Sequence, residues 1–536
     1  MGGRSRVETN NLIGGAWLAA HHGLQLVNPL AVQSRIGGRR KTELVDGVAL
    51  ETFVEAMRPA ASLRGHLTFH LKHEVLHLEL LSRLFEQLDP AALVDWIQQE
   101  PSGQYARRAG FFYEWLTGRE LELTAAIGGA YVDVLDDRKL VAASASKSVP
   151  NRRWRVRDNL PGTAAFCPIV RKTRDWTTAV AVDVRRLLQE LAEEFGEESL
   201  LRSAVWMTLR ESKASFAIEG ETDQTDRIQR FADVIARRTG EGELPLSDPA
   251  LGDLMGEILG SRSTLQQFGL RQSPVFVGEV VRFQEVVHYV APPADELNRM
   301  LNGLTVFWER TEGQPAVLRS AIVAFGFVYI HPLADGNGRL HRFLINDALR
   351  RDGVVQEPMI VPISAMITRN ASEQRAYTRL LDTVSRPLMA ALAGHYGFTE
   401  QMTTYPDGIH SNFQFSGEPI ARPLWRYPDL TQHVVWLADV LKRTVHEHMR
   451  QEATCLQQHA QARAAIKEII EMPNLQIDRL IRSAEATQGK LSNALAKEIP
   501  ILTEPGLWDA ILNAIAMAFH QPAAGAGEAG ERGSKP

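Results

Sequence analysis

The strongest constraint on the fold of this chain is a short glycine-containing loop between two apolar helical segments. Residues 321–330 form an unbroken apolar run that predicts a buried helix. His331-Pro332 ends that helix, because a residue that precedes proline disfavours the α region. Apolar residues at helical spacing resume after Gly338 and predict a second helix with one buried face. The loop 331–338 therefore joins two helices that pack together.

The second half of this loop has the features of an anion-binding site. Gly336, Asn337 and Gly338 stand at the N-terminus of the second helix, where backbone N–H groups and the helix dipole favour negative charge. Arg339 and Arg342 follow three residues apart, so they are neighbours on one helical face. Two arginines beside such a nest of N–H groups predict a polyphosphate ligand.

The first half of the loop adds a metal ligand and a base. Asp335 offers hard oxygen ligands of the kind that hold Mg²⁺ beside substrate phosphates. His331 lies at the rim of the same loop, and an imidazole titrates near neutral pH, as a general base must. A base, a metal ligand, an anion nest and two cations thus fall within twelve residues, which favours a catalytic site over a structural turn.

Composition excludes several other classes of protein. Lys and Arg number 59 against 64 Asp and Glu, and the net charge of −5 argues against a nucleic-acid coat or a polybasic membrane binder. The only two cysteines, Cys167 and Cys455, exclude a four-cysteine zinc site and fit a reducing compartment. No apolar run approaches the roughly 18 residues that span a bilayer. We therefore expect a cytoplasmic protein with no membrane partner.

The segment His-Pro-Leu-Ala-Asp-Gly-Asn-Gly-Arg-Leu-His-Arg, residues 331–342, resembles the signature of the Fic family, H-P-F-x-[DE]-G-N-G-R-x-x-R. Leu333 replaces the usual phenylalanine, a packing position. The resemblance implies Mg²⁺-dependent transfer of AMP from ATP, the co-substrate, to a Ser, Thr or Tyr hydroxyl. It further implies the following roles: His331 as the base, Asp335 as the Mg²⁺ ligand, Gly336, Asn337, Gly338 and Arg339 as phosphate ligands, and Arg342 as the γ-phosphate ligand.

A second segment resembles the inhibitory motif of the same family, [ST]-x-x-x-E-[GN]. Ser215 and Glu219 lie four residues apart near the end of a predicted helix, about 200–220, and Gly220 suits the position that ends it. We expect the apolar face of that helix to include Leu201, Val205 and Leu209. The resemblance places the chain in the class whose inhibitory helix precedes the Fic core, with Glu219 paired to Arg342.

The chain as a whole reads as mainly α-helical, with a helical Fic core and a β-hairpin flap. The N-terminal flank is expected to be helical with a small β part, and the C-terminal flank to be helical. The predicted divisions are 1–120 (mostly helical), 121–175 (small and β-rich), 176–400 (Fic domain, flap at about 274–290), 401–430 (linker), 431–520 (helical, with a candidate helix-turn-helix) and 521–536 (disordered).

The implied substrate is an unidentified target protein, with self-modification as a second outcome, and the sequence leaves open whether the chain forms a homo-oligomer. Other Fic-type reactions also remain open: transfer of UMP, phosphate or phosphocholine, and removal of AMP. His73-Glu74-Val75-Leu76-His77 matches the zinc-protease pattern H-E-x-x-H, with Glu100 as a distant third ligand, but the pattern is short enough to arise by chance. DNA binding by the C-terminal helices is the less favoured interpretation, because few cations are present there.

Overall fold

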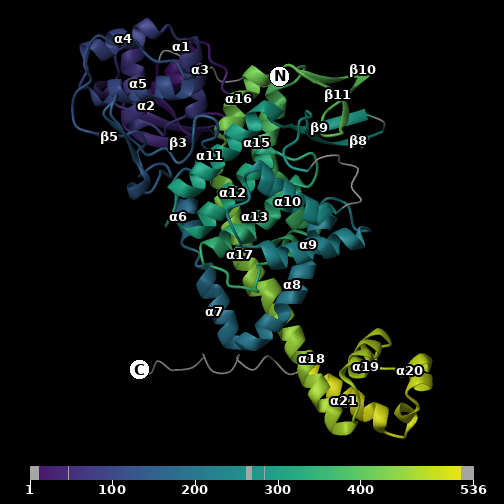
Figure 1. Ribbon diagram of the computed structural model, residues 1–536. Helices are drawn as coiled ribbons and strands as arrows, with labels where there is room; N and C mark the ends of the chain where they lie inside the picture. The colour runs from purple at the N-terminus through teal and green to yellow at the C-terminus, as the bar shows by residue number, and fades with distance from the viewer. Residues whose placement is uncertain (1–10, 46–47, 261–267, 283, 521–536) are drawn as a thin grey trace, which may run out of the picture.

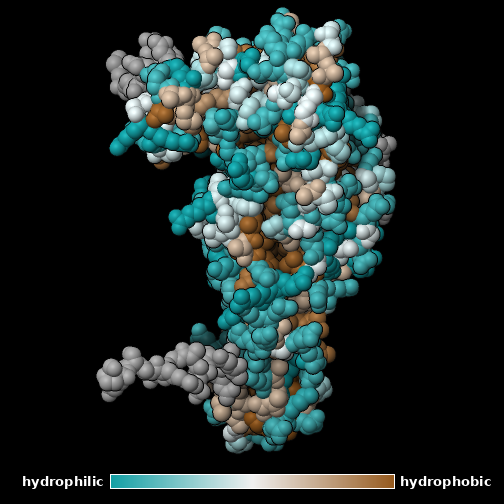
Figure 2. Space-filling model, turned by 90° about the vertical axis from the view of Figure 1, so that its left-hand side faces the viewer, coloured by the Kyte–Doolittle hydropathy of each residue, from teal (hydrophilic) through white to brown (hydrophobic). Residues whose placement is uncertain are grey.

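The computed structural model describes residues 11–45, 48–260, 268–282 and 284–520. The chain is mainly α-helical with small sheets, as predicted. Figure 1 shows an N-terminal part, a tall central core, and a small C-terminal part at the end of a long helix. The space-filling view shows a narrow waist between the core and the C-terminal part (Figure 2). The described residues include no helix long and apolar enough to cross a membrane.

The N-terminal part has more β structure than the sequence predicted. A four-stranded sheet, in the order β1-β2-β4-β3, and a three-stranded sheet, in the order β5-β7-β6, flank five helices. The strands are β1 (Leu12–Ile13), β2 (Gln33–Ile36), β3 (Lys41–Val45), β4 (Val48–Phe53), β5 (Val132–Asp133), β6 (Val149–Asn151) and β7 (Val156–Asp158). The helices are α1 (Gly14–His21), α2 (Leu63–His73), α3 (Leu78–Gln87), α4 (Pro90–Gln99) and α5 (Gln104–Thr117).

This part has a hydrophobic core of its own. Leu81 and Phe85 of α3 pack with Phe112 of α5 and with Trp154, which is 1% exposed. Gly110 of α5 lies against the Trp154 indole so closely that a Cβ at this position would overlap the ring. The glycine is therefore required by close packing and not by its backbone conformation.

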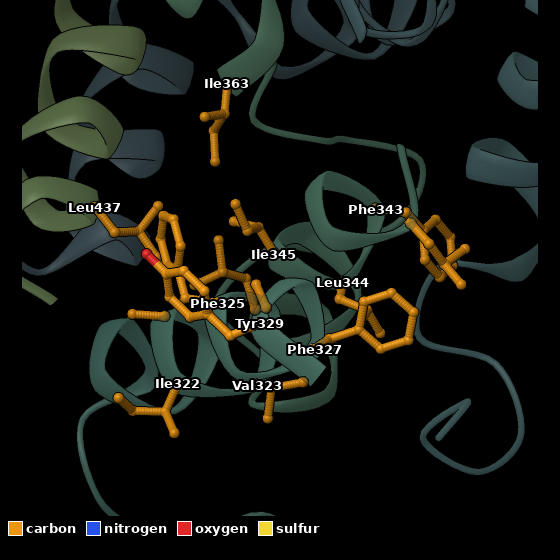
Figure 3. Close-up of a cluster of buried hydrophobic side chains, with 14 of the residues drawn as sticks. Ile322, Val323, Phe325, Phe327, Tyr329, Phe343, Leu344, Ile345, Ile363 and Leu437 are labelled. Carbon is orange, nitrogen blue, oxygen red and sulfur yellow. The ribbon is translucent and has the colours of Figure 1, made fainter. Parts of the chain in front are cut away.

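The central core is a bundle built around α12, which is buried on nearly all sides because α11, α13 and α17 surround it. Figure 3 draws Phe325 and Tyr329 of α12 close to Ile345 of α13 and Leu437 of α17. The helices of the core are α6 (Arg174–Val180), α7 (Val184–Phe195), α8 (Glu197–Ile218), α9 (Thr225–Arg238), α10 (Asp248–Leu259), α11 (Leu297–Arg310), α12 (Ala316–Ile330), α13 (Asn337–Arg351), α14 (Ile363–Ile367), α15 (Ala371–Ala391), α16 (Glu418–Arg426) and α17 (Thr431–Arg443).

Two antiparallel hairpins lie side by side at one end of the core (Figure 1). The first, β8 (Phe276–Val281) with β9 (Gln284–Val290), is the predicted flap. The second is β10 (Tyr396–Thr404) with β11 (His410–Phe415), and Phe276 of the flap packs on Phe398 and Phe413 of this hairpin. Segment 401–430, predicted as a linker, thus contains strand, turn and helix α16.

The C-terminal part begins later than predicted. Helix α17 belongs to the central core, and a π-helical turn at Thr444–Met449 leads into α18 (Arg450–Ile469), which extends away from it. Ile466 of α18 then packs with α19 (Asn474–Ala486), α20 (Asn493–Glu498) and α21 (Leu507–His520) in a separate small core. Cys167 and Cys455 are both free thiols.

Candidate active site

His331 is held in an unusual backbone conformation at the end of α12. It is the C-cap residue of the helix and has a φ of 50°, in the left-handed region. Its Nδ1 lies 3.2 Å from the carbonyl oxygen of Val328. A carbonyl can only accept a hydrogen bond, so Nδ1 carries the proton and the Nε2 lone pair is left to accept one. Burial, and after it the charge of Arg271, lowers the pKa of His331 to about 4, so the ring is neutral at pH 7.

The glycines of the loop allow a close approach to the start of α13. Gly336 is the N-cap residue and has a φ of 86°. A Cβ at Gly338 would overlap the Glu219 carboxylate, so a larger residue there would displace that carboxylate. The first N–H groups of a helix have no partner within the helix, and here they belong to the two glycines and their neighbours. They lie where the sequence predicts an anion nest.

The side-chain amide of Asn337 is engaged within the loop itself. Its Oδ1 accepts from the N–H of Leu333 at 3.0 Å, and its Nδ2 donates to the carbonyl of the same residue at 2.8 Å. The side chain is 3% exposed and closes the loop from inside. Because both ends of the amide are engaged, only the backbone N–H of Asn337 can serve a phosphate.

Arg339 is held by two carboxylates, one of which the sequence did not predict. Its two terminal nitrogens donate to Asp335 Oδ1 at 2.7 Å and to Glu221 Oε2 at 2.9 Å, and its Cζ lies 4.9 Å from the centre of the Phe216 ring. Its Nε is buried and has no hydrogen-bond partner among the described residues. The two carboxylates thus engage two of the five N–H donors of the guanidinium.

Helix α8 brings residues 215–220, the predicted inhibitory segment, to this loop. Gly220, with a φ of 76°, ends the helix in a Schellman motif: its N–H donates to Ala217, and the N–H of Glu221 donates to Phe216. The turn carries Glu219 and Glu221 back toward the two motif arginines. Leu201 and Val205, expected on the buried face of α8, are instead 39% and 75% exposed. The buried face is the one that carries Met207, Glu211 and Ser215.

Arg342 is almost completely enclosed by this helix. Its Nε donates to Ser215 Oγ at 2.9 Å, and one terminal nitrogen donates to the Ser215 carbonyl at 2.9 Å and to Glu219 Oε1 at 2.8 Å. The Arg342 side chain is 1% exposed and that of Glu219 is 36% exposed. Burial alone would lower the pKa of Arg342, but the Glu219 carboxylate outweighs it and raises that pKa.

Arg271 reaches the loop of His331 from outside the motif, and Asp407 binds the segment that follows Arg271. Arg271 donates from Nε to the His331 carbonyl at 2.8 Å, and Asp407 accepts from the N–H groups of Gln272 and Ser273 at 2.7 and 2.8 Å. No sequence signal pointed to either residue, because both act on backbone groups far away in the chain.

The H-E-x-x-H segment does not form a zinc site. Helix α2 ends at His73, Glu74 is its C-cap, and His77 is the N-cap of α3, so the two histidines do not share a helix. Glu74 is engaged with His70 at 2.7 Å and with the N–H of Gly15 at 2.8 Å. Across 11–45, 48–260, 268–282 and 284–520, no three His, Cys, Asp or Glu side chains are grouped to hold a metal ion.

The candidate helix-turn-helix has few features of a DNA-binding motif. Its second helix, α20, has only six residues. Arg479 of α19 pairs with Glu498, and Arg463 of α18 pairs with Asp478, so carboxylates neutralise two of the cations in this part.

Comparison with known proteins gives a family for the central core. The profile of the Fic/DOC family matches residues 251–349, which include α12, the loop and α13. Residues 251–349 are a Fic/DOC domain. The matched residues begin in α10 and contain the hairpin β8–β9 and the whole of the 331–342 motif.

Two curated relatives match part of the chain. The protein adenylyltransferase fic-1 of Caenorhabditis briggsae is 30% identical over 149 residues, and its counterpart in Caenorhabditis elegans is 28% identical over 148 residues. Each match spans 27% of this chain and 27% of the relative. A crystal structure of a Fic family protein from Desulfovibrio desulfuricans G20 aligns with a TM-score of 0.36 at 19% identity, covering 56% of this chain and 82% of that one.

Proposed function

We propose that this protein transfers AMP from ATP to a hydroxyl group of a target protein, with Mg²⁺ as the metal ion, and that Glu219 restrains the reaction. The observation that carries the proposal is the 3.2 Å contact of His331 Nδ1 with the Val328 carbonyl, from which the tautomer of His331 follows. With Nδ1 bonded to Val328, Nε2 is the nitrogen that can take a proton, and it belongs to the loop that ends in the anion nest. The Fic domain and two relatives named adenylyltransferases support the same chemistry.

The transfer itself uses few protein groups. Nε2 of His331 takes the proton of the target hydroxyl, whose oxygen attacks the α-phosphorus of ATP. The new bond joins that oxygen to phosphorus, the bond from the α-phosphorus to the bridging oxygen breaks, and pyrophosphate leaves. The backbone N–H groups at Gly336–Gly338 and the cations Arg339 and Arg342 stabilise phosphate charge, which is the main contribution of a protein to such a step.

The residues present fit Mg²⁺ bound together with a nucleotide. Asp335 is the ligand we propose: its side chain is 43% exposed, so a hydrated cation can reach it, and one carboxylate with substrate phosphates suffices for Mg²⁺. The bound ion would supply charge neutralisation at the phosphates. Asp335 also fixes Arg339, because one of its oxygens accepts from that guanidinium at 2.7 Å.

Restraint by Glu219 follows from competition for Arg342. A carboxylate and a γ-phosphate both offer oxygens to one guanidinium, so they compete for the same donor. Because Glu219 Oε1 lies 2.8 Å from Arg342, ATP bound in this conformation would have its γ-phosphate displaced and its α-phosphate turned away from in-line attack.

The test is to label the chain with ATP that carries radioactive phosphorus at either the α or the γ position. We expect incorporation from the α-labelled nucleotide only, and a gain in intact mass of one AMP. Incorporation from γ-labelled ATP would instead indicate transfer of phosphate. Incorporation only from UTP or from a phosphocholine donor would point to those reactions, and release of AMP from a modified protein would point to the reverse activity.

A further inference from the structure

The turn of the second hairpin is tied to the segment that precedes the flap. Asp407, between β10 and β11, is 3% exposed. Its Oδ2 accepts three hydrogen bonds, from the N–H of Gln272 at 2.7 Å and from the N–H and hydroxyl of Ser273 at 2.8 Å each. These bonds lower the pKa of Asp407 even though burial acts to raise it. The carboxylate is therefore ionised and strongly bound to this backbone segment.

Arg271 extends this tie to the catalytic loop. Its Nε donates to the His331 carbonyl at 2.8 Å, and its backbone N–H donates to the Pro332 carbonyl at 2.9 Å. Its two terminal nitrogens donate to the carbonyls of Ser273 at 2.9 Å and of Pro292 at 2.5 Å. One guanidinium, 2% exposed, thus joins the segment before β8, the segment after β9 and the loop after α12.

The backbone of His331 requires such support. Its φ of 50° lies in the left-handed region, which is unfavourable for a residue with a side chain. A conformation of that kind persists only when its surroundings determine it. The two bonds from Arg271 fall on the carbonyl of His331 and on that of the next residue, where they hold this conformation directly.

We propose that Asp407 and Arg271 are positioning residues, which hold the His331 loop in the conformation that presents Nε2 to the target hydroxyl. This inference rests on the proposed AMP transfer. Asp407 orders Ser273, the Ser273 carbonyl orients Arg271, and Arg271 fixes the loop. The second hairpin is therefore part of the catalytic apparatus, although it lies outside residues 251–349.

The first test is kinetic and uses Glu219→Gly as the parent chain, so that the restraint is removed. Asp407→Ala leaves four donors without their acceptor: three on Gln272 and Ser273, and the N–H of Ile409 within the turn. We expect its rate constant for self-modification at saturating Mg·ATP to fall about 10- to 100-fold, because small displacements of a reacting group cost that much. The Mg·ATP concentration at half-saturation should change by less than about twofold, because neither residue binds the nucleotide. Asp407→Asn, which keeps an acceptor oxygen, should recover part of the rate.

A matched control lies on the same hairpin. Thr404 Oγ1 is 2.9 Å from His410 Nδ1, and Thr404→Val removes this bond without reaching the segment of Gln272 and Ser273. It should retain the parent rate. If Asp407→Ala does not fold, Ser273→Ala removes only the hydroxyl bond to Asp407 and should give a smaller fall in the same rate constant.

The second test does not depend on transfer. Deuterium uptake by peptides that cover residues 328–340 should rise in Asp407→Ala and stay at the parent level in Thr404→Val. If Asp407→Ala kept both the parent rate and the parent uptake, the inference would be overturned. A parent chain that transfers no AMP would contradict the proposed function. Faster deuterium uptake by the loop in Asp407→Ala would then still show that Asp407 and Arg271 hold the His331 loop in place.

Discussion

At the scale of single residues, the protonation of His331 determines the pH range of the proposed reaction. Burial, followed by the charge of Arg271, lowers its pKa from 6.5 to about 4. A general base works in its neutral form, so activity is present above the lowered pKa and is lost as the pH falls through it. We predict a level transfer rate from about pH 8 to about pH 5.5, measured in the Glu219→Gly chain. A decline centred near pH 6.5 would show that the ring titrates as an ordinary histidine.

The ion pair of Glu219 with Arg342 predicts a second effect. Glu219→Gly removes the carboxylate that competes with the γ-phosphate and should raise transfer, including self-modification. Arg342 then keeps its two bonds to Ser215, and Glu219 was 36% exposed. The loss of stability should therefore lie nearer the ~1 kcal/mol of a surface pair than the 3–5 kcal/mol of a buried one.

The control for this prediction is Glu219→Gly/Arg342→Ala, which lacks both the competing carboxylate and the γ-phosphate ligand. It should not recover the activity of the single variant. Transfer by wild type and both variants is measured at one fixed Mg·ATP concentration, with thermal unfolding as the check of folding. Transfer by a folded Glu219→Gly chain that is equal to or lower than that of the wild type would contradict the proposal that Glu219 restrains the reaction.

At the scale of elements, the sequence predicted the contiguous motifs and, through the family resemblance, the pair of Glu219 with Arg342, but it missed other contacts between distant segments. The residues of 331–342 and 215–220 could be recognised because a loop between two helices, or one helix end, brings them together. Arg271 and Asp407 could not, since they bind backbone groups of distant segments. The H-E-x-x-H pattern wrongly suggested a zinc site, because α2 ends before Glu74 and the Glu74 carboxylate binds His70 and the N–H of Gly15. The prediction that Leu201 and Val205 lie on the buried face of α8 was wrong, because both side chains are exposed.

The packing of α5 against Trp154 gives a prediction at this scale. Alanine is favoured over glycine inside a helix by about 1 kcal/mol. Gly110→Ala should nevertheless destabilise the N-terminal part, by about 1–3 kcal/mol, because the new Cβ would overlap the indole. Gly256→Ala in α10 is the matched control, since its Cβ would lie 3.5 Å from the Phe268 ring, an ordinary contact, and it should be neutral or stabilising. The free energy of unfolding of both variants is measured by chemical denaturation. Equal changes in the two variants would show that the indole moves aside.

At the scale of the whole molecule, the N-terminal part has its own core and no assigned chemistry. We predict less than one zinc per chain in protein purified without chelators, because the helix break at Glu74 separates the two histidines. His77→Ala should keep the transfer rate of the parent chain. Stoichiometric zinc by elemental analysis, or loss of transfer in a folded His77→Ala chain, would assign this part a role in the reaction.

The central claim is that the Fic domain transfers AMP with His331 as its base. The most direct test is the intact mass of the Glu219→Gly chain after incubation with Mg·ATP, beside that of Glu219→Gly/His331→Ala. The account predicts a gain of one or more AMP groups in the first chain and none in the second, with ATP binding retained in both. The same gain in both chains would contradict the role of His331, and no gain in either folded, ATP-bound chain would contradict AMP transfer itself.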